Sequence, residues 1–178
     1  MTDDHPRNRR IDRVLEPSFV QGLNALALDD LRGRRDEALS EREHLSLLRR
    51  MLQGRSEILR AEMHSRASSE DEAPLVERLS EILADDEPAG PSRGESLTVA
   101  LPEEELLLAR RRVEKLAGDA GISDPTTLDD DALAAAVQTL ATEERIISAT
   151  RRAVMDALDA VQDELKRRYK EDPTLALH

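Results

Sequence analysis

The stretch LSLLRRMLQGRSEIL, residues 45–59, decides the fold of this chain because leucines recur in it every seven residues. Leu45, Leu52 and Leu59 continue a series that begins with Leu31 and Ala38. Seven-residue spacing returns a side chain to nearly the same face of a helix, and its repetition over more than four turns is typical of a coiled-coil seam. The pattern therefore predicts a long helix whose apolar seam packs against a partner helix.

A second segment repeats the same design 102 positions further along the chain. Its seam residues are Leu133, Leu140, Ile147, Val154 and Val161. Aromatic residues make up only 1% of the chain, so its core must consist of Leu, Ala, Val and Ile, and 36% of the residues are charged. Such a composition favours long helices over sheets. We expect an all-α fold, an antiparallel coiled coil of two long helices with short accessory helices and a partly flexible connection.

The pattern divides the chain into five segments. They are an N-terminal tail with a short helix (1–28), the first long helix (29–66), a connection with short helices (67–127), the second long helix (128–171) and a C-terminal tail (172–178). Short helices are predicted over 15–26, 74–84 and 102–118. Asp29 is the expected N-cap of the first long helix, since its carboxylate can accept from a free backbone N–H.

Composition excludes several functional classes. The net charge of −12 argues against direct DNA binding, which needs a basic face, and suits a basic protein partner. No run of 18 apolar residues and no apolar leader segment is present, so we expect a cytoplasmic protein without a membrane segment. There is no Cys, the four histidines are scattered, and no nucleophile motif or Gly-rich phosphate loop occurs. We therefore expect that this chain is not an enzyme.

A polar stripe borders the seam of each long helix. On the first helix it falls within an arc of about 80° and consists of Arg42, Ser46, Arg49, Gln53 and Glu57. The 102-residue offset gives the second stripe, Glu144, Ser148, Arg151, Met155 and Asp159. Either the stripes form an interhelical ladder of ion pairs, or they bind a ligand. The repeated Ser-x-x-Arg-Arg core favours a ligand, because a ladder needs complementary residues and not identical ones.

Gly54 points the same way, because a glycine in mid-helix costs about 1 kcal/mol relative to alanine. The close approach of a bulky group would explain it.

Four segments of the chain resemble a known family. RRIDRVLEPSF, LRGRRDEA, LSLLRRMLQGR and ELKRRY are similar to segments of the actinobacterial "aerial mycelium formation" proteins, the RsiG-type anti-sigma factors that bind cyclic di-GMP. The family motif E-x3-S-x2-R-x3-Q-x3-D occurs once on each helix. Arg42, Glu57 and Met155 depart from it. The resemblance implies that cyclic di-GMP binds to Arg42, Ser46, Arg49, Gln53, Glu57, Glu144, Ser148, Arg151 and Asp159.

The resemblance also implies a function. The chain would be an anti-sigma factor that holds a WhiG-type sporulation sigma factor, of the flagellar sigma class, inactive while a pair of cyclic di-GMP molecules is bound between the two helices. The residue types agree, since Arg is suited to phosphates and to guanine O6 and N7. Arg49 and Arg151 are the expected strongest contacts. The alternative is a ligand-free coiled-coil scaffold or adaptor, in which the stripes only set the helix pairing.

Overall fold

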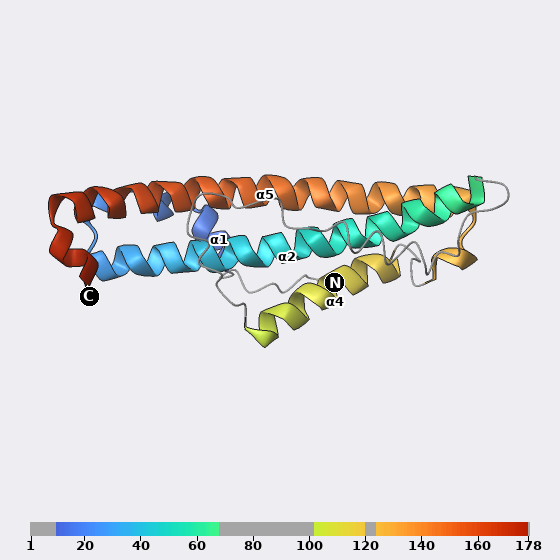
Figure 1. Ribbon diagram of the computed structural model, residues 1–178, viewed down its shortest axis with the longest axis horizontal. Coiled ribbons are helices and arrows are strands. Elements are labelled where there is room, and N and C mark those ends of the chain that lie inside the picture. Colours follow the sequence, from blue (N-terminus) through green and yellow to red (C-terminus); the bar gives the residue numbers. More distant parts are fainter. Residues whose placement is uncertain (1–9, 68–101, 120–123, 178) are drawn as a thin grey trace, which may run out of the picture. The chain divides into compact units, whose positions relative to one another are not determined.

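The computed structural model describes residues 10–67, 102–119 and 124–177, and every regular element in these ranges is a helix (Figure 1). The α-helices are α1 (Arg10–Leu15), α2 (Leu28–Ala67), α4 (Glu103–Asp119) and α5 (Asp130–Glu171). The 3-10 helices are η1 (Pro17–Phe19), η2 (Leu23–Ala25), η3 (Pro125–Thr127) and η4 (Pro173–Leu177). The predicted all-α class is confirmed. The helix predicted over 74–84 lies outside the described residues.

The chain forms two compact units, and both long helices contribute to each. The first unit comprises Met1–Leu45 and Ala149–His178, and the second comprises Ser46–Ser148. Neither α2, α5 nor any other helix within the described ranges is long and apolar enough to cross a membrane.

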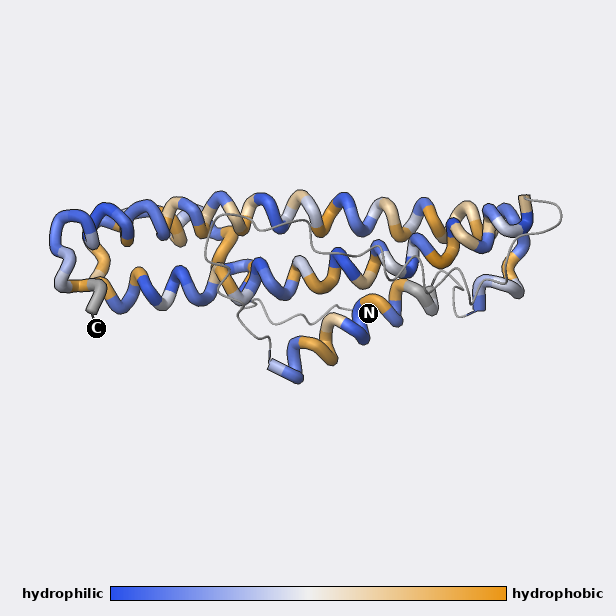
Figure 2. Tube along the Cα trace, viewed as in Figure 1, coloured by the Kyte–Doolittle hydropathy of each residue, from blue (hydrophilic) through white to orange (hydrophobic). Residues whose placement is uncertain are grey.

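The predicted seam is buried on both long helices. None of its ten residues is more than 4% exposed: Leu31, Ala38, Leu45, Leu52 and Leu59 on α2, and Leu133, Leu140, Ile147, Val154 and Val161 on α5. Figure 2 shows hydrophobic and hydrophilic residues alternating along both helices with the helical repeat. Each fully buried Leu, Ile or Val side chain contributes roughly 1.5–3 kcal/mol, so the seam is the main source of folding free energy.

In the first unit the start of α2 lies beside the end of α5. Arg32 Nε donates to the Tyr169 hydroxyl at 3.2 Å, and Arg32 Nη2 donates to the carbonyl of Leu175 at 2.7 Å. Arg168 donates to the carbonyls of Leu26 and Leu23 at 2.8 and 2.9 Å. The two helix segments of this unit are therefore antiparallel, as predicted (Figure 1).

In the second unit the end of α2 lies beside the start of α5. Arg66 donates to the carbonyl of Leu128 at 2.7 Å and pairs with Asp130 at 3.0 Å. Asp129 caps α5, because its carboxylate accepts from the Ala132 N–H at 2.8 Å. These segments are antiparallel as well.

Two local predictions are wrong. The segment 15–26 is not one helix: α1 ends at Leu15, and only the short 3-10 helices η1 and η2 follow. A helix does not continue across Pro17, and Gly22 adopts a left-handed φ of 63°. The expected cap is also misplaced. Leu31 N–H donates to the carbonyl of Ala27 at 3.1 Å, so α2 begins at Leu28 and Asp29 lies in the first turn.

The α1 helix is joined to α2 by a partly buried ion pair. Arg10 Nε donates to Glu41 Oε2 at 2.7 Å, and the Glu41 side chain is only 7% exposed. A neighbouring pair, Arg13 with Glu37, joins the same two helices, but its side chains are 47% and 24% exposed. The two pairs differ mainly in their access to water.

Truncation of these two arginines should therefore have unequal effects. Arg10→Ala leaves the Glu41 carboxylate buried without its partner, and we expect a loss on the order of 3 kcal/mol in the free energy of unfolding. Arg13→Ala is the matched control, and it should cost about 1 kcal/mol or less. Urea unfolding followed by circular dichroism measures both. Equal losses for the two variants would contradict this account of the Arg10–Glu41 pair.

A second ion cluster lies near the end of α5. Glu164 accepts from Arg167 at 2.7 and 2.8 Å and from Arg168 at 2.8 Å. These two guanidinium groups, Arg167 foremost, lower the pKa of Glu164 to about 2 from an ordinary value of 4.5. Because the folded pKa is depressed, the stabilisation is fully present above pH 4.5 and is lost as the pH falls toward 2.

We expect Glu164→Gln to reduce the loss of stability on acidification. The thermal midpoint should be measured at pH 7, 4.5 and 2.5 for the parent and the variant, with Asp163→Asn as a control at an exposed neighbouring carboxylate. The difference between pH 7 and pH 2.5 should shrink in Glu164→Gln and stay near the parent value in Asp163→Asn. A parent-like acid profile in Glu164→Gln would show that this cluster contributes nothing to the acid sensitivity.

Candidate functional site

The second unit joins polar stripe residues from both long helices. Glu144 Oε1, on α5, accepts from Gln53 Nε2 at 2.8 Å and from Arg49 Nε at 3.4 Å, both on α2. The Arg49 side chain is 41% exposed and that of Glu144 is 28% exposed. The stripes predicted on the two helices thus meet at a polar cluster that consists of Arg49, Gln53 and Glu144.

The Arg49 contact within this polar cluster is weak. The Arg49–Glu144 contact is at the long limit for a hydrogen bond and is partly open to water. Such an ion pair contributes about 0–1 kcal/mol. An acceptor with a better geometry, such as a phosphate oxygen or a guanine edge, can therefore replace the carboxylate as the partner of Arg49 at little cost.

Both serines of the predicted site are half-buried in the same unit. Ser46 lies one turn before Arg49 on α2, and Ser148 lies one turn after Glu144 on α5. Glu57 is exposed, two turns beyond Arg49. Because the helices are antiparallel, the two serines lie on the same side of the polar cluster, one on each helix.

Three predicted site residues belong to the first unit. Arg42 is half-buried, and its Nη2 donates to Glu43 Oε1 at 2.5 Å. Arg151 is half-buried, and Asp159 is exposed. Met155, which stands where the family motif has Gln, is half-buried.

Comparison with known protein families supports the resemblance seen in the sequence. Residues 17–83 match the RsiG-like family. This segment includes all of α2 and so all five candidate residues of the first stripe, and it ends before α4 and α5. No curated protein matches the chain. The match supports an anti-sigma role, with a sigma factor as the kind of partner.

The stripe within the RsiG-like segment differs in charge from the one on α5. The 102-residue offset relates Arg49 to Arg151, and Glu144 to Arg42. The copy on α2 therefore carries two arginines, Arg42 and Arg49, where the copy on α5 carries Glu144 and Arg151. The α2 copy is the more cationic of the two and is better suited to an anion.

The structure leaves open space beside Gly54. A Cβ added there meets no atom of the described chain within 4 Å. Gly54 lies about 100° around α2 from Gln53, outside the arc of the polar stripe. Nothing in the described residues requires a glycine here, and the close approach of a bulky group stays a prediction.

The structure also reveals a surface that the motif search missed. Leu106, Leu107 and Leu108 on α4 are between 43% and 53% exposed. The three consecutive leucines are the sequence signal that could have identified this surface. Among the described residues, no cluster of His, Asp and Glu could hold a metal ion.

Proposed function

We propose that this chain is an anti-sigma factor that binds cyclic di-GMP and, in that state, sequesters a WhiG-type sigma factor. The observation that carries the proposal is the polar cluster of Arg49, Gln53 and Glu144, in which an RsiG-like helix meets the second copy of the stripe. Binding alone accounts for the activity, and no catalytic step is required.

The chemistry of the cluster suits a guanine nucleotide. A guanidinium such as that of Arg49 can donate two hydrogen bonds to guanine O6 and N7 or to a phosphate. The Glu144 carboxylate can accept from the guanine N1–H and exocyclic amine, and the Gln53 amide can both donate and accept. Ligand binding would therefore exchange a weak pair between side chains for stronger bonds to the nucleotide.

The phosphate charges of the ligand would offset the repulsion between arginines on the two helices and so stabilise their pairing. Arg49 and Arg50 on α2, and Arg151 and Arg152 on α5, bring four cations to the two stripes. Each cyclic di-GMP carries two phosphate charges, so a bound pair would supply four anions. The two-fold symmetry of the nucleotide also agrees with two motif copies on antiparallel helices.

The sigma factor would recognise the nucleotide-bound helices. A protein of net charge −12 is electrostatically complementary to a partner whose DNA-binding surfaces are basic. If the partner binds the nucleotide-bound form more tightly, linkage requires that it raise the nucleotide affinity by the same factor. Cyclic di-GMP thereby acts as a switch for sigma factor binding.

A ligand-free scaffold is the alternative, and one observation favours it. Glu144 already accepts from Arg49 and Gln53 across the two helices, which is what an interhelical ladder would do. The two hypotheses differ in whether the stripe arginines bind nucleotide.

Arg49→Ala and Arg151→Ala should each weaken cyclic di-GMP binding by about 1–3 kcal/mol, the contribution of one bidentate contact to guanine. The controls are Arg50→Ala and Arg152→Ala, which remove the same charge from the exposed adjacent positions. They lose long-range attraction but no bidentate contact, so they should weaken binding less than Arg49→Ala and Arg151→Ala do. Isothermal titration calorimetry measures the affinities, and circular dichroism checks that the helices are retained. Parent-like binding by the Arg49→Ala/Arg151→Ala double variant would rule out this site and favour the scaffold.

The switch is tested with the WhiG-type sigma factor. We expect the tagged chain to retain the sigma factor in the presence of cyclic di-GMP and to release it without the nucleotide. In calorimetry the nucleotide affinity should rise when the sigma factor is present, because the coupling is reciprocal. Equal nucleotide affinity with and without sigma factor would show that there is no switch, even if both ligands bind.

A further inference from the structure

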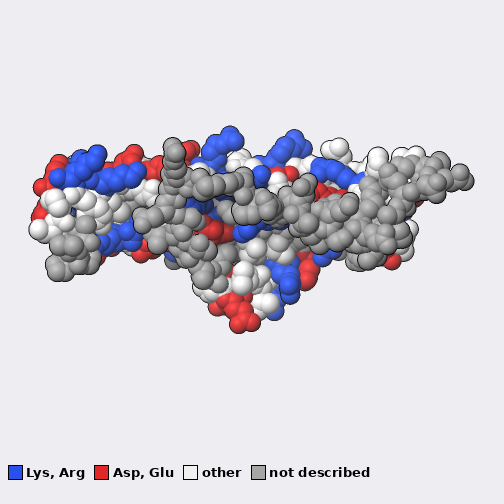
Figure 3. Space-filling view, viewed as in Figure 1, with Lys and Arg blue, Asp and Glu red and all other residues white. Residues whose placement is uncertain are grey.

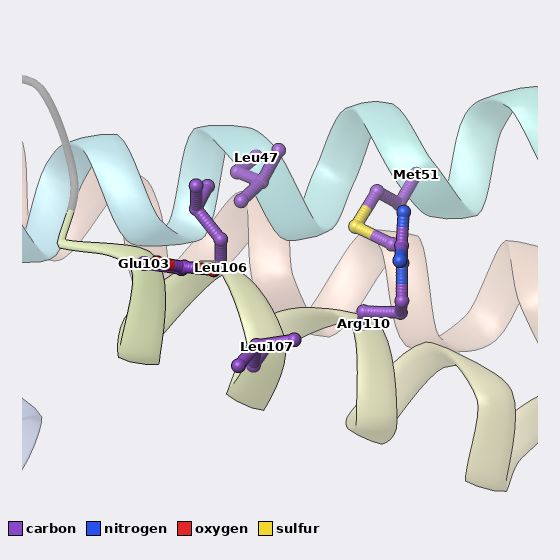
Figure 4. Close-up of a pocket in the computed structure, with 6 residues that line it drawn as sticks. All are labelled: Leu47, Met51, Glu103, Leu106, Leu107 and Arg110. Atoms are coloured by element: carbon purple, nitrogen blue, oxygen red, sulfur yellow. The ribbon is translucent and has the colours of Figure 1, made fainter.

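An open groove lined by apolar side chains lies between α2 and α4 in the second unit. Leu47 and Met51 of α2 form one side, and the other side consists of Glu103, Leu106, Leu107 and Arg110 of α4. The groove encloses about 440 Å³. In Figure 4, Leu106 points toward Leu47, and the Arg110 side chain extends toward α2.

The leucines of the groove are only partly covered by the packing of α4 within its own unit. Ala109 and Val113 do that and are 0% and 1% exposed, whereas Leu106 and Leu107 are 43% and 45% exposed. An apolar surface of this kind beyond the needs of the fold marks an interaction site. The groove thus has room for apolar side chains from outside the unit.

The two charged residues of the groove determine which charges a helix bound there must carry. Glu103 precedes the Leu106–Leu107 pair by three residues, and Arg110 follows it by three. Both lie on the same face of α4, both are exposed, and neither forms an ion pair or hydrogen bond within the ranges that the structure describes. Figure 3 shows acidic side chains gathered at the tip of α4, where its first turn holds Glu103, Glu104 and Glu105.

This arrangement is complementary to itself. We propose that the groove binds the α4 helix of a second copy of this chain, with the two α4 helices antiparallel about a two-fold axis between Leu106 and Leu107. Glu103 then lies opposite the partner's Arg110, and Arg110 lies opposite the partner's Glu103. The leucine pairs meet at the centre, where Leu47 and Met51 widen the apolar contact. A two-fold interface needs this kind of self-complementary surface.

The opposite flank of α2 remains available for nucleotide. Leu47 and Met51 lie about 130° around α2 from the stripe of Ser46, Arg49 and Gln53, on the other side of the buried seam. Gly54 is on the groove flank, and the open space above it permits a close approach of a second helix. The proposed dimer is therefore independent of the nucleotide site, and either one can fail without the other.

Sedimentation velocity of the full chain over a range of concentrations tests the dimer. A contact made mainly by one pair of short helices is at the small end of specific interfaces, so we expect a reversible monomer–dimer equilibrium. Leu107→Glu should shift the protein to monomer. Leu108→Glu is the matched control, because Leu108 is 53% exposed on the same helix but does not line the groove. It should leave the dimer intact.

Charge reversal tests the pairing itself. Glu103→Arg and Arg110→Glu each place like charges together twice, and we expect the dimer dissociation constant to rise about tenfold or more. The double variant restores both pairs and should dimerise like the parent, as should an equimolar mixture of the two single variants. Circular dichroism checks the helix content, since a cation in the first turn of α4 is unfavourable.

Three results would overturn the proposal. The first is that the parent is monomeric at every concentration. The second is that Leu107→Glu and Leu108→Glu weaken the dimer equally. The third is that the double charge-reversal variant does not restore the dimerisation that the single variants lose. A monomer that loses sigma factor binding in Leu107→Glu alone would identify a helix of the partner protein as the occupant of the groove.

Discussion

Burial of the apolar seam, whose residues are spaced seven apart on each long helix, is the constraint on which the rest of the structure depends. The core has almost no aromatic residues, so its stability comes from aliphatic side chains repeated on both long helices. The helices must keep this seam out of water, and that requirement fixes which of their faces can carry anything else. Polar groups are buried only at a cost, which is why the nearly buried Glu41 requires Arg10 as its partner.

The seam leaves two flanks on α2, and the chain uses them differently. One flank carries the polar stripe, where Arg49 and Gln53 meet Glu144 of α5. The other carries Leu47 and Met51, which form the groove with α4. Because the two flanks lie on opposite sides of the seam, the proposed nucleotide site and the proposed protein interface would not compete for the same face of α2.

The sequence was a good guide wherever a regular repeat carried the information. The seam positions were predicted residue by residue, and α2, α4 and α5 begin and end within two residues of the predicted bounds. Prediction failed where a single residue decided the backbone. Pro17 and Gly22 divide the N-terminal segment into short turns, and Asp29 lies inside the helix that it was expected to cap. Such positions depend on local backbone conformation, which periodicity does not report.

The sequence by itself determined an all-helical chain, its two seams and the polar stripe beside each of them, because these follow from the 3.6-residue period of a helix. Only the tertiary structure decided which stripe residues meet. Glu144 joins Gln53 and Arg49 because the antiparallel register brings those turns together, and residues 91 and 95 positions apart carry no local sign of that contact. The groove beside α4 likewise exists only once α4 packs through Ala109 and Val113 and leaves Leu106 and Leu107 open to solvent.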